Sequence, residues 1–397
     1  MHFCPLIFKA ARIPAIPFRG IIMNIPSIRA NFIFFILSLL ILTAAVSAQT
    51  TTTATPPPVD DSDDVIKIDS RLVVVPVSVT STSGDPVLGL TASDFKIRED
   101  NKPQVIENVG NADTVPLEFA ILFDISATTS PMFRFQQETA AAFLADVMKD
   151  KDRATIYTVG AKPELIRSRA TAAEAVTAIR SITPTKEFTA FFDSVSVAAE
   201  DLLRNAPSGT RRVILVISDG EDTNSSNIAK AIQDGYTKAG DKINSLDTKA
   251  LYKLTVDTRN TASARERVRV SKSLQNADTV FYSINPAGSS FQLNKMSVYG
   301  QENMQKFADE TGGTAFLPKF QPIDTKDELQ NSGNMRKNAA TLEQIFKQLT
   351  NELRAQYLVQ YYSEGEFPNG KFVKLDVGLT NPGTNRLRAR QGYYVKN

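Results

Sequence analysis

Cysteine, histidine and tryptophan are scarce in this chain of 397 residues, which has one cysteine, one histidine and no tryptophan. The cysteine is Cys4 and the histidine is His2, so both lie near the N-terminus. A single cysteine cannot close a disulfide within the chain, and the fold must therefore rest on its core. Beyond residue 4, catalysis by Ser-His-Asp or Cys-His groups and zinc bound by histidine are excluded for the same reason.

The N-terminal segment has the pattern of a secretory signal peptide. Residues 32–46 are apolar or small and uncharged, and the run is shorter than the ~20 residues that span a bilayer. Arg29 precedes the run, and Val46-Ser47-Ala48 is a small-residue cleavage pattern. We expect residues 1–48 to be removed during export to the periplasm or the exterior; a retained N-terminal anchor is the alternative.

Removal of this segment would also change the net charge. The whole chain has 45 basic and 43 acidic residues, a formal charge of +2. Four of the basic residues and none of the acidic ones lie in residues 1–48, which leaves 41 basic and 43 acidic residues and a charge of −2. Nothing in this balance indicates a nucleic-acid-binding protein.

The rest of the chain divides by composition and hydrophobic rhythm. Residues 49–64 are rich in Thr, Pro and Asp and are typical of an extended linker. Residues 65–114 alternate as β-strands, and residues 356–397 return to this alternation. We expect the two flanks to pair as one small β-sandwich-like domain, with residues 115–355 inserted between them as a separate domain.

The central domain has the rhythm of an α/β fold. Residues 117–123 and 213–217 are nearly continuous apolar runs, as expected for strands covered on both faces. Helical patterns alternate with strands, which predicts a doubly wound, mostly parallel sheet. Two polar stretches fit this alternation poorly: residues 222–277 are interpreted as a helix-prone insertion, and residues 320–338 are expected to be loop.

Two short segments of the flanks predict turns. Residues 100–103, Asp-Asn-Lys-Pro, lie between alternating segments and favour a hairpin in which Asn adopts the left-handed conformation. Residues 365–371 imitate a phosphate-binding loop but lack its final Ser or Thr and lie between two strands rather than before a helix. We interpret residues 365–371 as a hairpin.

Polar side chains gather at three points of the predicted α/β domain. Asp124, Ser126 and Thr128 follow the first buried strand, Thr189 stands where a loop enters a helix, and Asp219 follows the second buried strand. Ligands of open α/β sheets collect at the carboxyl ends of the strands. Two carboxylates and three hydroxyls form an all-oxygen set, which suits Mg²⁺ or Mn²⁺. An ion held in this way can take an Asp or Glu carboxylate of another molecule.

This arrangement resembles the metal-ion-dependent adhesion site (MIDAS) of von Willebrand factor type A (VWA) domains. The MIDAS pattern is Asp-x-Ser-x-Ser, followed later by a Thr and then by an Asp after a strand. Asp124 and Ser126 match directly, Thr128 stands where the pattern has Ser, and Thr189 and Asp219 match in Thr-Ala-aromatic-x-Asp and Ser-Asp-Gly contexts.

The flanks extend the resemblance. Residues 89–95, 99–104 and 390–394 are similar to the opening and closing segments of the VWFA-related exported proteins common in acidobacteria. The resemblance implies a VWA fold over about residues 115–355 and one bound ion, Mg²⁺ or else Mn²⁺ or Ca²⁺. It also implies a protein partner that offers an Asp or Glu carboxylate.

Two other function classes stay open. A structural or assembly component of the cell envelope would use a degenerate VWA scaffold that binds no metal. An enzyme is not expected: a phosphatase of the haloacid dehalogenase type, for example, needs a second acid two residues after Asp124, where this chain has Ser126.

The other charged residues near these motifs have simpler interpretations. Glu221 and Asp222 are expected to be solvated loop acids, and Asp193 a helix-start residue. The helix-prone stretch 259–272 is rich in Arg and Lys and is interpreted as a solvated face, with a partner surface as the alternative.

Overall fold

The structure, a computed structural model, describes residues 71–395 except for 127–131, 186–187, 287–294 and 324. The predicted signal peptide and linker therefore lie outside the described residues, and so does Thr128. No helix in the described part of the chain combines the length and the apolar character that a membrane crossing requires.

The α/β domain is built on a six-stranded sheet with the strand order β10-β9-β8-β5-β6-β7. All neighbours pair in parallel except β6 and β7, which are antiparallel. Every residue of the central strand β5 is buried, as its apolar run predicts. The strands are β5 (Leu117–Asp124), β6 (Arg153–Val159), β7 (Pro163–Ala170), β8 (Arg211–Ile217), β9 (Thr279–Ile284) and β10 (Ala315–Phe316).

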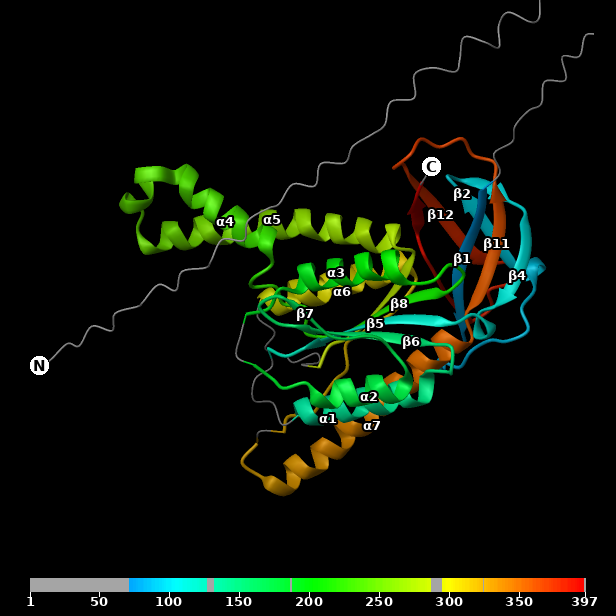
Figure 1. Ribbon diagram of the computed structural model, residues 1–397, viewed down its shortest axis with the longest axis horizontal. Helices are drawn as coiled ribbons and strands as arrows, with labels where there is room; N and C mark the ends of the chain where they lie inside the picture. Colours follow the sequence, from blue (N-terminus) through cyan, green and yellow to red (C-terminus); the bar gives the residue numbers. More distant parts are fainter. Residues whose placement is uncertain (1–70, 127–131, 186–187, 287–294, 324, 396–397) are drawn as a thin grey trace, which may run out of the picture. The chain divides into compact units, whose positions relative to one another are not determined.

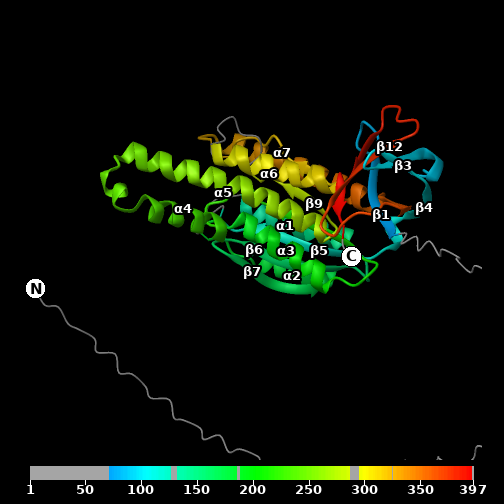
Figure 2. The same ribbon diagram turned by 90° about the horizontal axis from the view of Figure 1, so that it is seen from above.

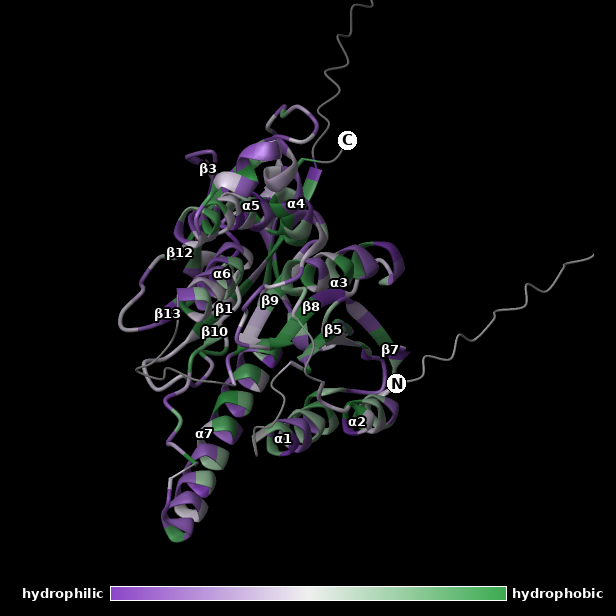
Figure 3. Ribbon diagram, turned by 90° about the vertical axis from the view of Figure 1, so that its left-hand side faces the viewer, coloured by the Kyte–Doolittle hydropathy of each residue, from purple (hydrophilic) through white to green (hydrophobic). Residues whose placement is uncertain are grey.

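Helices cover both faces of this sheet (Figure 1). On one face lie α1 (Met132–Val147), α2 (Ala172–Ser181) and α7 (Glu328–Arg354); on the other lie α3 (Phe191–Asn205), α5 (Thr248–Asn276) and α6 (Lys295–Thr311). Each face has its own buried apolar cluster, and the hydropathy colouring places apolar strands between the two helix layers (Figure 3). The predicted doubly wound, mostly parallel sheet is confirmed.

Three features of this domain differ from the expectation. Strand β7 follows β6 as an antiparallel edge strand that the charged sequence did not reveal. Helix α7 begins at Glu328, within the stretch expected to be loop, and its N-cap Asp327 accepts hydrogen bonds from the amides of Leu329 and Gln330. The stretch 222–277, which was expected to be an insertion, also contributes part of the α/β core.

That stretch forms α4 (Ser226–Ala239), a 3₁₀ turn (Gly240–Ser245) and α5. In α5, Ala262, Val270 and Leu274 pack in the sheet core, so its C-terminal half is the crossover between the parallel strands β8 and β9. Only α4 and the N-terminal half of α5 extend past the sheet as a helical hairpin (Figure 2). The parallel strands β8 and β9 require a crossover connection, and here the crossover helix is elongated. The segment is therefore longer than a simple connection.

The flanks of the chain form two four-stranded sheets, of order β13-β1-β11-β4 and β14-β12-β2-β3. Strand β1 pairs with β11 and β13, and β12 pairs with β2, so both sheets combine strands from both ends of the described chain. These pairings confirm the predicted β domain. Its strands are β1 (Arg71–Thr80), β2 (Phe95–Glu99), β3 (Lys102–Gln104), β4 (Ile106–Asn111), β11 (Tyr357–Ser363), β12 (Phe372–Leu379), β13 (Arg386–Ala389) and β14 (Gly392–Tyr394), with 3₁₀ turns at Ala92–Asp94 and Ala112–Thr114.

One of the two turn predictions for this domain holds. Asp100 and Asn101 have φ values of 44° and 68° and join the antiparallel strands β2 and β3, so the hairpin and its left-handed Asn are present, but Lys102 and Pro103 belong to β3 and the turn is shorter than predicted. The prediction for residues 365–371 is wrong. They connect β11 to β12, which belong to different sheets, so the segment is a crossing between sheets.

A buried carboxylate anchors the core of the β domain. The side chain of Glu99 is 2% exposed and accepts hydrogen bonds from the hydroxyls of Tyr361 at 2.8 Å, Ser363 at 2.8 Å and Tyr393 at 2.5 Å. These residues come from β2, β11 and β14, so one acceptor ties the two sheets together. A buried polar group is tolerated when it is fully hydrogen-bonded, and its removal leaves the partners unsatisfied.

We expect Glu99→Ala to lower the free energy of unfolding by about 3 kcal/mol, because three buried hydroxyls lose their acceptor. Exposed Glu107 on β4 supplies the matched control, and Glu107→Ala should change the value by less than about 0.5 kcal/mol. Urea unfolding followed by circular dichroism measures both. Equal effects of the two substitutions would contradict a structural role for the Glu99 cluster.

Helix α6 meets the loop after β8 at two glycines. A Cβ on Gly300 would lie 2.5 Å from the carbonyl carbon of Gly220 and 2.7 Å from the carbonyl oxygen of Asp219. Gly220 itself has φ 76°, a conformation that side chains rarely adopt. Only glycines allow this backbone contact, and the contact fixes where the loop after β8 lies.

Gly300→Ala should therefore cost about 2 kcal/mol of unfolding free energy, because the new methyl group meets backbone that has no room to yield. Gly333 is a helical glycine of α7 at which an added methyl group would have nothing within 4 Å, so Gly333→Ala should stabilise the protein by about 0.5–1 kcal/mol. Chemical unfolding of the two variants compares them directly. A shift of the same sign in both would show that the glycine contact is not tight.

Candidate functional site

The carboxyl end of β5 lies where the chain changes direction across the sheet. From β5 the chain passes through α1 to β6 on one side and later reaches β8 on the other side of β5. Open α/β sheets bind their ligands at such a switch point. The parallel register aligns Phe123 with Ile217, and the residues that follow, Asp124 and Ser218, therefore come together at this edge.

Asp124 is the buried centre of this edge. Its Oδ1 atom accepts hydrogen bonds from the amide of Ser126 at 2.9 Å and from the Ser126 hydroxyl at 2.6 Å. Its Oδ2 atom accepts a hydrogen bond from the Ser218 hydroxyl at 2.5 Å. Burial raises the pKa of Asp124, and the hydrogen bonds from Ser126 and Ser218 partly oppose that rise. Ser218 was not singled out from the sequence, although it opens the Ser-Asp-Gly motif.

Asp219 lies close enough to Asp124 for the charge of one carboxylate to affect the pKa of the other. Burial raises the pKa of Asp219 to about 7, with the negative charge of Asp124 as the second cause. Its Oδ1 atom accepts a hydrogen bond from the amide of Glu221 at 3.0 Å, which lowers the pKa. Among the described residues, no lysine or arginine forms an ion pair with either aspartate. Within the part of the chain that the structure describes, the site thus holds two carboxylates and no basic side chain paired with them.

Thr189 lies on the loop next to these carboxylates. It is buried, its amide donates to the Thr223 hydroxyl at 2.8 Å, and its carbonyl accepts from the amides of Thr223 and Asn224 at 2.9 Å. The loop before α3 is thereby fixed to the loop that carries Asp219. Within the described part of the chain, Thr189 makes no hydrogen bond to Asp124 or Asp219.

The expectation that Asp222 is a solvated loop acid is wrong. Asp222 is 9% exposed, and its carboxylate accepts hydrogen bonds from the amide of Phe192 at 2.9 Å, the amide of Ser225 at 3.0 Å and the Ser225 hydroxyl. Burial raises its pKa, and these hydrogen bonds oppose the rise. Asp222 therefore joins the start of α3 to the start of α4, and the sequence signal for this role was the Asp-x-x-Ser spacing before a helix.

Two neighbouring acids have other contacts. Asp193 lies in the first turn of α3, as expected, and its carboxylate accepts from the amide of Ser226 at 2.8 Å and from its hydroxyl at 2.7 Å. Glu221 is half-buried and accepts a hydrogen bond from the hydroxyl of Ser297 on α6. Both residues tie the site loops to neighbouring helices.

The site could bind a hard cation such as Mg²⁺ only if hydroxyl oxygens coordinate the ion together with the carboxylates. No group of three Asp, Glu, His or Cys side chains able to hold a metal ion exists among the described residues. The two aspartates, Ser126 and Thr189 are all oxygen donors, as Mg²⁺, Mn²⁺ and Ca²⁺ prefer. The residues present fit such an ion in chemistry and in charge, because a cation would offset the repulsion between Asp124 and Asp219.

Comparison with known proteins is informative only at the level of solved structures. No protein-family model and no curated protein matches the chain. Solved structures to which it is similar include a von Willebrand factor type A protein from Catenulispora acidiphila (10% identity, 81% of this chain and 72% of that chain, TM-score 0.37). An aerotolerance-related membrane protein from Bacteroides fragilis shares 15% identity over 57% of this chain and 99% of its own, with a TM-score of 0.31.

Proximal thread matrix protein 1 from the mussel byssus, with a zinc-occupied MIDAS motif, shares 11% identity over 64% of this chain and half of its own length, with a TM-score of 0.36. At such identities and scores these similarities decide nothing about ligands. The strand pairings of the chain itself carry the conclusion that residues Leu117–Arg354 form a doubly wound α/β domain of the kind that the sequence resemblance to VWA domains implied.

Proposed function

We propose that this protein binds another protein through one divalent metal ion, Mg²⁺ or else Mn²⁺ or Ca²⁺, held at the carboxyl end of β5. Asp124, Ser126, Thr189 and Asp219 hold the ion directly or through water, together with Thr128, which lies outside the described residues. The ion accepts an Asp or Glu carboxylate of the partner. The proposal extends to export of the protein and to the absence of enzyme activity.

One observation carries the proposal: the buried carboxylate of Asp124 and the half-buried carboxylate of Asp219 lie together at the switch point of the sheet, and among the described residues neither forms an ion pair with a basic side chain. In a dry environment a carboxylate pair of this kind is costly, and the raised pKa of Asp219 is the sign of that cost. A bound divalent cation would convert the repulsion into attraction, and a coordination position that the protein leaves open would take an external carboxylate. The same carboxylates with a lysine beside them would not support a metal site.

The hydroxyl of Ser126 supports the same assignment. It donates to Asp124 in the structure and has free lone pairs for a cation. With neutral hydroxyls in place of further acids, the two aspartates balance the ion without surrounding it with excess negative charge, so an external carboxylate can still bind. Recognition of an acidic partner therefore follows from a coordination position that the protein leaves open.

Export rests on the sequence alone. Residues 32–46 and the Val46-Ser47-Ala48 pattern lie outside the described residues and support secretion to the periplasm or beyond. The view that the protein is not an enzyme rests on the lack of His and Cys beyond residue 4.

A second candidate function has one observation in its favour. Both oxygens of Asp124 already accept hydrogen bonds, from Ser126 and Ser218, so the edge of the sheet is satisfied without an ion. A scaffold with a degenerate site would then serve as a structural or assembly component of the cell envelope.

Metal binding separates the two candidates. We expect millimolar Mg²⁺ or Mn²⁺ to raise the thermal midpoint of residues 49–397 by a few degrees relative to EDTA, because a ligand that binds only the folded state stabilises it by mass action. Asp219→Ala should abolish this rise, whereas Asp241→Ala, at an exposed position of the 3₁₀ turn after α4, should retain it. An unchanged midpoint in a protein with a normal unfolding transition would support the scaffold alternative.

The raised pKa of Asp219 predicts how metal-free stability depends on pH. Below about pH 3 the carboxyl group is mostly protonated in both states, so it has little effect on stability. Between its ordinary pKa of 3.8 and about 7 the unfolded state loses the proton first, so stability falls as the pH rises. In EDTA, Asp219→Asn should stabilise the protein by about 1–2 kcal/mol at pH 8, a value discounted for partial exposure, and should have almost no effect at pH 4.

Urea unfolding of wild type and Asp219→Asn at several pH values gives the measurement. Asp241→Asn removes the same charge at an exposed position and serves as the control. A gain from Asp219→Asn that is the same at pH 4 and pH 8 would mean that the aspartate is not strained in the folded state.

A further inference from the structure

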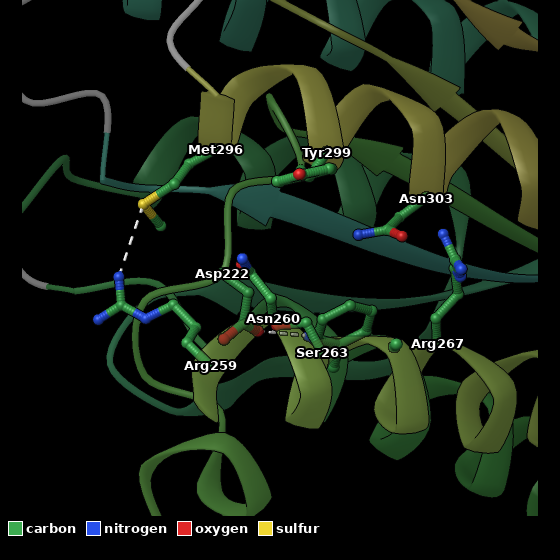
Figure 4. A pocket seen from close by; sticks show the side chains of 12 residues that line it. Asp222, Arg259, Asn260, Ser263, Arg267, Met296, Tyr299 and Asn303 are labelled. Atoms are coloured by element: carbon green, nitrogen blue, oxygen red, sulfur yellow. Dashed lines mark hydrogen bonds between the residues drawn. The ribbon is translucent and has the colours of Figure 1, made fainter. Parts of the chain in front are cut away.

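A pocket of about 220 Å³ opens between α5 and α6, next to the candidate metal site (Figure 4). Its wall includes Gly220 and Asp222, so it continues directly from the loop that carries Asp219. A single water needs only about 10–15 Å³ on this measure, and the pocket has room for a side chain.

Two arginines of α5 line the pocket without acidic partners. Arg259, Ser263 and Arg267 follow one another at intervals of four residues and therefore share one face of the helix. Among the described residues, neither Arg259 nor Arg267 forms an ion pair, and the Nε atom of each is buried without a hydrogen-bond acceptor. The Nη1 atom of Arg259 contacts only the sulfur of Met296, at 3.7 Å, a weak acceptor.

The one carboxylate that lines the pocket does not neutralise them. Asp222 already accepts hydrogen bonds from the start of α3 and from Ser225. Two guanidinium groups that line the pocket therefore retain unused donors, and the described residues around the pocket offer them no available negative charge. Such groups bind carboxylates or phosphates through pairs of parallel hydrogen bonds.

The opposite wall is partly apolar. Tyr299 of α6 is half exposed, and the buried ring of Phe192 from α3 also lines the pocket. Asn303 of α6 is 8% exposed and brings an amide to the end of the pocket where Arg267 lies (Figure 4). Cations at one wall and rings at the other suit a carboxylate on a short apolar stem, which is the chemistry of Glu and Asp side chains.

Charge along α5 favours an acidic partner as well. Residues 259–272 contain five basic residues and one acid, Glu266, which pairs with Arg269 at 2.7 Å. The sequence interpretation of this stretch as a solvated face therefore holds only in part, because Arg259 and Arg267 turn toward the pocket. The remaining positive charge attracts an acidic segment over a distance of about a Debye length.

We propose that this pocket binds a second acidic side chain of the partner segment. The proposal rests on the proposed function, in which the first acidic side chain reaches the metal ion at Asp124 and Asp219. The partner is thus a protein segment with two acidic residues, one read by the ion and the other by Arg259 and Arg267. Inorganic anions share the chemistry of the second group, and the experiment distinguishes them.

The test measures binding of a fluorescein-labelled hexaglutamate peptide to the full chain by fluorescence anisotropy, in EDTA and in millimolar Mg²⁺. In EDTA, Arg259→Gln and Arg267→Gln should each weaken binding about tenfold, the loss expected for a charge-assisted hydrogen-bond pair. Arg265→Gln removes the same charge from an exposed position of α5 that does not line the pocket, and should change binding less than twofold. Thermal midpoints verify that all variants fold.

Measurements with Mg²⁺ and with Asp219→Ala distinguish the contribution of the pocket to peptide binding from that of the metal site. Mg²⁺ should tighten binding of the peptide to the wild type, and Asp219→Ala should remove only that increment. If the two pocket arginine variants bind the peptide more weakly but Mg²⁺ does not change binding to the wild type, the proposed function is contradicted and the pocket proposal is supported. Equal losses in all three arginine variants, or no peptide binding in EDTA, would overturn the pocket proposal, as would displacement of the peptide by an equal concentration of inorganic phosphate.

Discussion

Burial of a carboxylate, Asp124, at the carboxyl end of the central strand is the constraint on which the candidate site depends. The parallel register of β5 and β8 leaves Asp124 beside Ser218 and within the field of Asp219, and helices on both faces keep water away. A sheet that needed only stability would place apolar residues there. The arrangement is understandable as preparation for a cation, because the hydroxyls of Ser126 and Ser218 hold Asp124 in one orientation without cancelling its charge.

The position of the loop that carries Asp219 depends on contacts with neighbouring helices. Asp222 fastens it to the start of α3, and Gly220 lies against Gly300 of α6 at a distance that excludes any side chain. Helix α6 therefore has two roles, since the turn that presses on the loop also forms a wall of the pocket between α5 and α6. A ligand in that pocket would touch the same loop that positions Asp219.

Much of this organisation is predictable from the sequence because it depends on local rules. Continuous apolar runs identify β5 and β8, and a carboxylate directly after each run marks the edge of a parallel sheet. Roles that arise only from tertiary contacts were not predictable. Asp222 looks like a surface acid until α3 places the amide of Phe192 above it, and β7 looks polar because it is an edge strand. Residues 365–371 look like a hairpin because turn chemistry does not reveal that the strands on either side belong to different sheets.

The β domain leaves the candidate site free for a partner. Its contacts with the α/β domain lie at the amino edge of the sheet: Arg390 pairs with Asp278 just before β9 and bridges to Thr311 at the end of α6, and Arg211 at the start of β8 donates to the side-chain oxygen of Gln356, just before β11, at 3.0 Å. The carboxylates and the pocket lie at the carboxyl edge. Because parallel strands have all their carboxyl ends at one edge, a domain formed from both flanks can close the opposite edge without covering the site. The division of the chain, with the flanks at one edge of the sheet and the polar loops at the other, therefore favours a domain that presents its loops outward to another molecule.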